Sequence, residues 1–214
     1  MKDILQDIVA HTHSLGFLSI VKVTGGNETT IDSMAEDRSV IMSATSNHSI
    51  ADGTFGMPNL DKLALHLKNP EYQKDAKIDV VTAERNGETM PTHIHFENNA
   101  GDFQNDYRFM NKAIIEEKLK TVKFKGVEWD VTLEPTKAKV NELQQVAGIY
   151  GGIEPNFTVK TVDGNLVITV GAQDGSFTGK RTFAMNVNGE ITEGYAWPLN
   201  QVLAILKLGM SGTC

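Results

Sequence analysis

Residues 2–34 read KDILQDIVAHTHSLGFLSIVKVTGGNETTIDSM. In the first part of this stretch, apolar residues recur every three or four positions, which predicts a helix over residues 2–15. In the second part, β-branched and apolar residues dominate residues 17–23 and 29–34, which lie on either side of the turn sequence Gly25-Gly26-Asn27. The chain therefore begins with an amphipathic helix followed by strands.

The remainder of the first half continues with strands and one more helix. The patterns predict, in order, a strand, a helix opened by a proline, a β-hairpin and a last strand, at residues 39–45, 58–68, 77–84 with 88–96, and 105–110. Asn86-Gly87 is a strong hairpin signal because both residues tolerate the positive φ that a two-residue turn requires.

The second half begins the same order again. Its patterns predict a strand, a helix, a hairpin, a strand and a final helix, at residues 122–133, 136–148, 157–162 with 166–170, 182–187, and 197–207. The hairpin turn is Asp163-Gly164. Recurrence of one order of elements over such long stretches indicates an internal repeat.

The repeat divides the chain into two domains. We expect an α+β fold in which residues 1–110 and residues 122–214 each place two helices on an antiparallel sheet, with a connector at residues 111–121. The first half continues with strands after its second helix, whereas the second half ends shortly after its own. By the repeat, the second domain lacks its last strands, and we expect that the sequence is truncated at its C-terminus.

The composition narrows the class of protein. The chain has 214 residues, of which 40% are hydrophobic and 22% charged, which is typical of a globular protein. Its single cysteine, Cys214, excludes an internal disulfide and a thiolate metal cluster in this sequence. The first residues carry acids where a signal peptide is basic, and no apolar run reaches the ~18 residues of a membrane span. We expect a cytoplasmic protein, in the host cytoplasm if the source is a phage, without a membrane partner.

The charge is unevenly distributed. The net charge of −7, from 20 basic and 27 acidic residues, predicts repulsion from nucleic acids when the chain is taken as a whole. The four predicted amphipathic helices carry six lysines and four acids, a net charge of +2, which leaves −9 for the rest of the chain. Either the charged helix faces are solvated and have no further role, or the helix lysines form a basic surface on an acidic protein.

One pair of histidines has the spacing of a metal site. His93 and His95 fall in a predicted strand and share one face, and Glu97 continues that face. The same spacing also fits the polar outward face of an alternating strand, with Ile94 and Phe96 inward. A metal-dependent enzyme that uses His93 and His95 is therefore one alternative, and a structural β-rich phage protein is another. No motif for acid–base or nucleophilic catalysis is evident, so we expect no enzyme, no cofactor and no metal.

Five segments resemble the DNA sliding clamps, the processivity factors of DNA polymerases. Residues 2–9, 17–23 and 30–42 look like the opening of proliferating cell nuclear antigen. Residues 60–68, LDKLALHLK, resemble the second helix of the family. Residues 129–170 are similar to the third helix and hairpin of the clamps of T-even-type bacteriophages. The resemblance extends over nearly the whole chain, and the order of its elements carries it.

This resemblance implies a ring without catalysis. In the family, helices line a central hole and sheets form the outer wall, and two domains per subunit suggest a trimer. Ring closure pairs edge strands of neighbouring subunits, here at about residues 105–111 and 181–187. The ring would encircle duplex DNA without reading its sequence and would tether the replicative DNA polymerase. Further implied partners are the clamp loader and peptides that dock beside the connector.

The resemblance also implies which residues face DNA. They are the basic residues of the predicted helices, with two histidines as weaker candidates: Lys62, Lys68, Lys137, Lys139 and Lys207, then His11 and His13.

Overall fold

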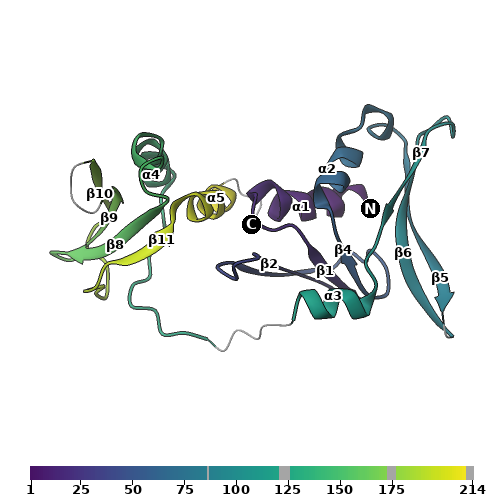
Figure 1. Cartoon of the computed structure of the whole chain (residues 1–214), viewed down its shortest axis with the longest axis horizontal. Coiled ribbons are helices and arrows are strands. Elements are labelled where there is room, and N and C mark those ends of the chain that lie inside the picture. The colour runs from purple at the N-terminus through teal and green to yellow at the C-terminus, as the bar shows by residue number, and fades with distance from the viewer. Residues whose placement is uncertain (86, 121–125, 173–176, 211–214) are drawn as a thin grey trace. The chain divides into compact units, whose positions relative to one another are not determined.

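The chain folds into two compact units. The computed structural model describes residues 1–85, 87–120, 126–172 and 177–210 (Figure 1). The first unit comprises Met1–Lys123 and the second Phe124–Cys214, and each has its own hydrophobic core. Helices combined with antiparallel sheets confirm the α+β class. In the described part of the chain, no helix combines the length and the apolar character that crossing a bilayer requires.

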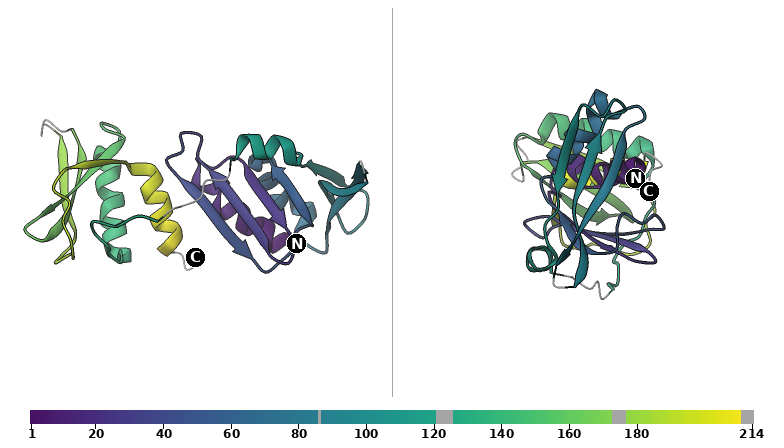
Figure 2. Two further views of the ribbon diagram at one scale, coloured as in Figure 1. Left: turned by 90° about the horizontal axis from the view of Figure 1, so that it is seen from below. Right: turned by 90° about the vertical axis from the view of Figure 1, so that its right-hand side faces the viewer.

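A four-stranded antiparallel sheet with two helices forms the main body of the first unit. Its elements, in chain order, are α1 (Lys2–His11), the 3-10 helix η1 (His13–Leu15), β1 (Val21–Gly25), β2 (Thr29–Met34), β3 (Ile41–Ser46), β4 (Gly53–Met57) and α2 (Leu60–Lys68). Strands β1 to β3 form a meander and β4 returns to the other side of β1, so the order is β3-β2-β1-β4. Helices α1 and α2 contact each other and lie on one face of this sheet (Figure 2).

The apolar stripes of the two helices explain this arrangement. Their buried residues recur at the spacing of one helical face: Ile4, Leu5, Ile8 and Val9 in α1, and Leu60, Leu63, Ala64 and Leu67 in α2. They share a core with inward residues of β1, where Val21 and Val23 are both 0% exposed. Burial of each leucine-sized side chain stabilises the fold by about 1.5–3 kcal/mol, so both stripes face the sheet.

A three-stranded sheet extends the same core. It follows the 3-10 helix η2 (Pro70–Tyr72) and consists of β5 (Lys77–Arg85), β6 (Glu88–Glu97) and β7 (Gln104–Arg108), in the order β5-β6-β7. Ile94 and Phe96 of β6 are fully buried in the core that α2 and β4 share. The ring of Tyr72 lies 5.4 Å from that of Phe96, which joins η2 to this sheet.

The chain after β7 returns to the first sheet. Gly56 of β4 and Met110 exchange two backbone hydrogen bonds of 2.8 Å each. Helix α3 (Lys112–Lys118) then packs on β4, with Ile115 fully buried. A Cβ added at Gly56 would lie 2.9 Å from atoms of Ile115, so this close approach requires glycine.

The second unit has the same topology as the four-stranded part of the first. Its elements are α4 (Lys137–Tyr150), β8 (Asn156–Val162), β9 (Asn165–Gly171), β10 (Thr178–Ala184), β11 (Tyr195–Pro198) and α5 (Leu199–Met210). The order is β10-β9-β8-β11, so the strand before the second helix again lies beside the first strand. Asp163 and Gly164 both have positive φ, as the predicted hairpin turn requires. Helices α4 and α5 contact each other over the second core.

Several local predictions were wrong. Residues 126–133 form no strand, and their apolar side chains Val131 and Leu133 pack against the second core instead. Helix α3, within the segment predicted as the connector, was not expected, and β10 begins at Thr178, before the predicted strand at 182–187. Strands β4 and β11 were not predicted, because GTFGM and YAWP are short and lack a clear alternation.

Three predictions fall on residues outside the described part of the chain. They are the first position of the Asn86-Gly87 turn, the start of the strand predicted at 122–133, and the C-terminal end at 211–214 with Cys214.

The contact between Gly56 and Ile115 can be tested by substitution. Gly56→Ala places a methyl group against Ile115, and we expect stability to fall by about 1–3 kcal/mol in urea unfolding, the usual cost of an overpacked site. Gly26→Ala is the matched control, since a Cβ there meets nothing within 4 Å. Equal unfolding midpoints for the two variants would contradict the proposed packing of α3.

Candidate nucleic-acid interface

The face of α2 that points away from the core carries two of the predicted lysines. Lys62 and Lys68 are exposed and flank Leu65, which is 61% exposed, at intervals of three residues. Lys62 lies 3.4 Å from Asp61, but both side chains are more than half exposed, so this ion pair is weak. The outer face of α2 is therefore a short basic strip.

The second unit places its three predicted lysines on two contacting helices. Lys137 is the first residue of α4, Lys207 lies in the last turn of α5, and both are exposed. Lys139 is half-buried, and its Nζ donates a hydrogen bond of 2.9 Å to Glu142, which offsets part of its charge. Because α4 and α5 contact each other, these three lysines belong to one helix layer.

The first helix contributes little positive charge. His11 and His13 are half-buried, and Nδ1 of His11 lies 2.8 Å from the backbone oxygen of Asp7. Asp3 and Asp7 are exposed on the same helix. The role of His11 and His13 as weaker DNA-facing residues stays a prediction.

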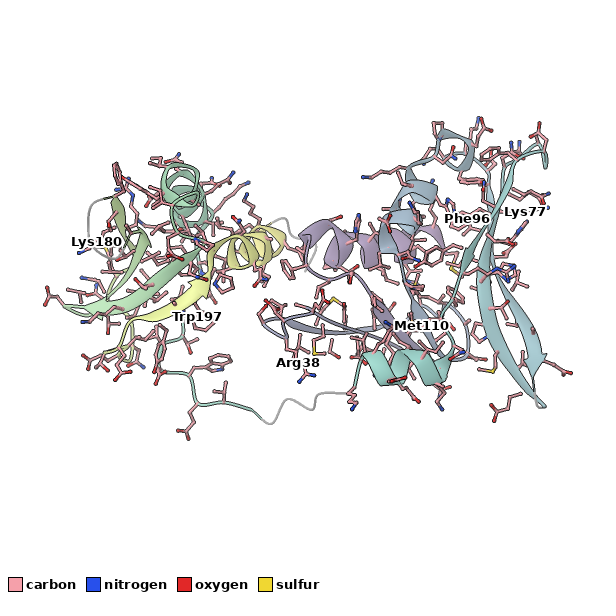
Figure 3. The ribbon with its side chains drawn as sticks, in the orientation of Figure 1. Arg38, Lys77, Phe96, Met110, Lys180 and Trp197 are labelled. Atoms are coloured by element: carbon pink, nitrogen blue, oxygen red, sulfur yellow. The ribbon has the colours of Figure 1, made fainter. Side chains whose placement is uncertain are left out.

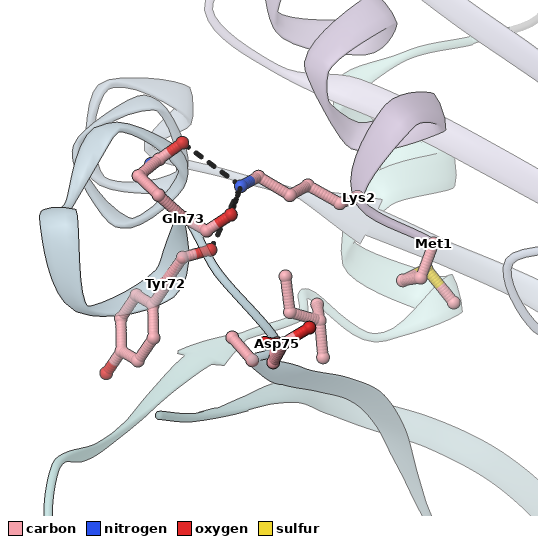
Figure 4. A pocket seen from close by; sticks show the side chains of 7 residues that line it. Met1, Lys2, Tyr72, Gln73 and Asp75 are labelled. Atoms are coloured by element: carbon pink, nitrogen blue, oxygen red, sulfur yellow. Dashed lines mark hydrogen bonds between the residues drawn. The ribbon is translucent and has the colours of Figure 1, made fainter. Parts of the chain in front are cut away.

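Lys2, the one lysine of α1, makes hydrogen bonds within the first unit. Nζ of Lys2 donates hydrogen bonds to the backbone oxygens of Tyr72 (3.0 Å) and Gln73 (3.4 Å) and to Oε1 of Gln73 (3.1 Å) (Figure 4). Nε2 of Gln73 donates in turn to the backbone oxygen of Leu67 at 2.7 Å. Lys2 thus ties the start of α1 to the loop after η2. Sequence reasoning could not find this role, because the residues that it joins are some 70 positions apart.

Similarity to known proteins is visible in structure and not in sequence. No family model and no curated protein sequence matches the chain. The fold matches PCNA from Thermococcus kodakaraensis with a TM-score of 0.58 and 10% identity, over 97% of this chain and 82% of that one. It matches the DNA polymerase III subunit beta from Pseudomonas aeruginosa with a TM-score of 0.64 and 13% identity, over 97% of this chain and 55% of that one. The chain has the sliding-clamp fold.

A third match agrees with this assignment. A putative DNA polymerase III beta subunit from Eubacterium rectale matches with a TM-score of 0.58 and 12% identity, over 97% of this chain and 55% of that chain. The chain therefore spans about half the length of the two beta subunits that it matches. At 10–13% identity, these likenesses establish the fold. The fold that the sequence resemblance implies is thus confirmed.

In this clamp fold, a cavity of about 240 Å³ opens on the sheet face opposite α1 and α2. Residues of β1, β2 and β3 and the end of α3 line it: Lys22, Thr30, Asp32, Ser33, Met34, Ile41, Met42, Ser43, Leu119 and Lys120. Its apolar wall includes Met34 and Leu119, whereas Met42 packs against the core on the other face of the sheet. The cavity lies beside the predicted connector, where the resemblance places a docking peptide.

Polar residues cross the same sheet face beside the apolar wall. Nζ of buried Lys22 lies 3.3 Å from Asp32, and the hydroxyl of Ser43 donates to Asp32 at 2.8 Å. The register places Lys22 opposite Asp32 and Asp32 opposite Ser43. Sequence reasoning missed this row because its members become neighbours only once the register is known.

The two histidines of the alternative metal site lie on the polar face of the β5-β6-β7 sheet. Nδ1 of His95 lies 2.9 Å from Oδ1 of Asp106, and Nε2 of His93 lies 3.6 Å from the same oxygen. Glu97 pairs with Lys77 at 3.0 Å (Figure 3). The hydrogen bond from His95 lowers the pKa of Asp106, and the one from Lys77 lowers the pKa of Glu97.

This arrangement fits the interpretation of His93 and His95 as part of the polar outward face of an alternating strand. Ile94 and Phe96 point inward and are fully buried, while His93 and His95 pair with a carboxylate on the neighbouring strand. Among the residues that the structure describes, no group of three or more His, Cys, Asp or Glu side chains could hold a metal ion. The geometry therefore gives the metal-dependent alternative no support.

His66 lies between α2 and the three-stranded sheet. The ring of His66 is 5.0 Å from that of Phe96. Burial lowers the pKa of His66, and a hydrogen bond with the backbone of Asp106 opposes this effect in part. His66 is therefore neutral at pH 7, on the side of α2 that packs against β6.

The lowered pKa of His66 makes the first unit acid-sensitive. The neutral ring stabilises the fold above its ordinary pKa of 6.5, and this contribution disappears as the pH falls toward the lower folded value, because the unfolded chain binds the proton first. We expect a lower urea midpoint at pH 5.5 than at pH 7.5, and a smaller pH dependence in His66→Phe. His48→Asn, an exposed control, should keep the full dependence. Unchanged pH dependence in His66→Phe would contradict this assignment.

Proposed function

We propose that this chain is a sliding clamp: a ring subunit that encircles duplex DNA and tethers a DNA polymerase, without catalysis or a cofactor of its own. One observation carries the proposal, namely the exposed lysines on the helices of an otherwise acidic chain with the clamp fold. Helices α1, α2, α4 and α5 together carry a net charge of +2, which lies on α4 and α5, while α1 and α2 sum to zero and the rest of the chain carries −9.

Exposed lysines on helices suit contacts with DNA that move freely. Ammonium groups on flexible stems attract phosphates of any sequence, and each contact is weak and sensitive to salt. A ring is held on DNA by topology, so weak contacts are sufficient. The acidic remainder of the chain would disfavour binding of DNA to the outer surface. The exposed members of this set are Lys62, Lys68, Lys137 and Lys207. Lys139 forms an ion pair with Glu142.

The free strand edges support assembly into a ring. Strand β7 ends the three-stranded sheet and β10 ends the sheet of the second unit, close to the segments at 105–111 and 181–187 that the resemblance assigns to closure. Pairing of β7 in one subunit with β10 in the next would satisfy both edges. The common strand order of the two sheets supports an internal repeat, with 1–110 and 122–214 as its domains and 111–121 as the connector. A trimer would then place six similar units around DNA.

The cavity beside α3 is suited to short peptides of partners. Met34 is unbranched and adaptable, and Leu119 adds an apolar wall. We assign this cavity to the polymerase and the clamp loader, which would compete for it. Such a role places the protein with replicating DNA in the cytoplasm, that of the host if the source is a phage.

Substitution of the helix lysines tests the DNA interface. In fluorescence anisotropy with a 30-base-pair duplex, Lys62→Ala with Lys68→Ala should weaken binding several-fold. The slope of log K against log salt should also become shallower by about 0.9 for each phosphate that a lysine no longer neutralises. Lys160→Ala, an exposed lysine on β8, is the control and should change neither quantity. An equal effect of Lys160→Ala would refute the assignment of the interface to the helices.

The ring itself requires a second measurement. A clamp should leave linear DNA by sliding off its ends, and should remain on the same DNA when it is a closed circle. Equal dissociation from linear and circular DNA would contradict the proposed function.

A further inference from the structure

The free edge of β7 presents the backbone of Asp106. Hydrogen bonds to a neighbouring strand alternate along an antiparallel pair, and Phe109 donates its backbone N–H to Thr92 of β6 at 2.9 Å. By this alternation, Tyr107 also bonds to β6, and the N–H and C=O of Asp106 point to the free edge. The side chain of Asp106 lies on the polar face of the sheet, 2.9 Å from His95. The edge of β7 therefore combines free backbone groups with a carboxylate.

The free edge of β10 has the same geometry. Ala172 donates its backbone N–H to Phe177 at 2.9 Å. By the same alternation, Gly179 bonds to β9, and the N–H and C=O of Lys180 point outward. A Cβ added at Gly179 would lie 2.6 Å from Tyr150 of α4, so Gly179 faces the helices and Lys180 lies on the opposite face of the sheet. The side chain of Lys180 is exposed (Figure 3). This edge therefore combines free backbone groups with an ammonium group.

Two edges of this geometry can pair without inverting either sheet. Residues that exchange bonds across an antiparallel pair place their side chains on the same face. A β7 edge joined to a β10 edge would therefore put the two polar faces on one side and the two buried faces on the other. The edge of β5 does not match that of β10. By the same alternation, its outward backbone groups belong to Ile78, whose side chain is buried in the core.

Strand β3 shares the edge geometry of β10 but lacks its charge. It is the counterpart of β10 in the first unit, and the backbone bond between Ala35 and Val40 sets its alternation. Its outward positions are uncharged, and they are Ile41, Ser43 and Thr45. The outward positions of β10 are Thr178, Lys180 and Thr182. Charge is therefore what distinguishes the two edges as partners for β7.

The charges also favour one register. With Lys180 opposite Asp106, opposite charges meet in a pair that exchanges two backbone hydrogen bonds. A shift by two residues, the smallest that keeps the faces aligned, would place Lys180 opposite Gln104 or Arg108. The first shift loses the attraction, and the second brings like charges together. The hydrogen bond from His95 lowers the pKa of Asp106, so this carboxylate is ionised at neutral pH.

We propose that Lys180 selects β10 as the strand that pairs with β7 of a neighbouring copy of this chain, and that it fixes the register by lying opposite Asp106. The selection rests on the ring closure of the proposed function and supplies its specificity. Lys180 thereby acts as a specificity-determining residue of assembly, because it disfavours the uncharged edge of β3 as a competitor.

Charge reversal tests the pair. In sedimentation equilibrium, Lys180→Asp and Asp106→Lys should each weaken self-association at least threefold, because each places like charges opposite each other. The double variant, which exchanges the two charges, should restore the association. Lys160→Asp is the matched control, since it changes the net charge equally at an exposed position of β8 away from the edge. Equal weakening by Lys160→Asp, or a double variant no better than the single ones, would overturn the proposal.

Disulfide formation tests the strand and the register. With Lys180 opposite Asp106, Gln104 lies opposite Thr182, so Gln104→Cys with Thr182→Cys should link separate copies in a Cys214→Ser background. Gln104→Cys with Thr45→Cys, which reports pairing with β3, should not. Links at the second pair alone, or links within a single chain, would refute the selection of β10. A chain that stays monomeric and links at neither pair would refute ring closure and the proposed function with it, whereas oligomers insensitive to both charges would refute the role of Lys180 alone.

Discussion

The burial of one apolar stripe per helix against one sheet face is the constraint on which the rest of each unit depends. In the first unit, Leu5 and Leu63 can leave water only by packing over the side chains of β1, and α4 and α5 meet the same requirement over β8. Figure 2 shows both helices of a pair on one face of their sheet, and with their apolar stripes buried there, their polar sides are left to face solvent. Within each unit the exposed lysines that the resemblance assigns to DNA therefore lie in the helix layer, and in the first unit the opposite sheet face remains free for the cavity beside α3.

The sequence predicted the parts of the fold that depend on local pattern. The helices containing Leu63 and Leu143 follow from a period of 3.6 residues, and the Asp163-Gly164 turn follows from its tolerance of positive φ. Strand β11 was missed because four residues are too few to show an alternation, and its place is set by pairing with β8. Helix α3 was missed for a related reason, since its single buried residue, Ile115, is stabilised by a glycine far away in sequence.

In the candidate sites, too, local sequence pattern predicts some features and tertiary neighbours decide the others. The resemblance assigns Lys62, Lys137 and Lys207 to the DNA-facing set, and the structure finds all three exposed. Charge alone could not separate them from Lys2, whose ammonium group is occupied by the loop after η2, or from Lys139, which shares its charge with Glu142. These distinctions depend on tertiary neighbours. The same holds for His93 and His95, whose role became clear only when the register placed Asp106 beside them.

The anchoring of α3 also has a mechanical consequence. Tension on the chain beyond residue 120 would reach α3 before any strand, and this helix of seven residues is held mainly by one buried side chain. Behind it lie the paired bonds of Met110 and Gly56, and only then the core. The first unit would therefore yield in steps, with α3 detaching first while the two sheets stay folded.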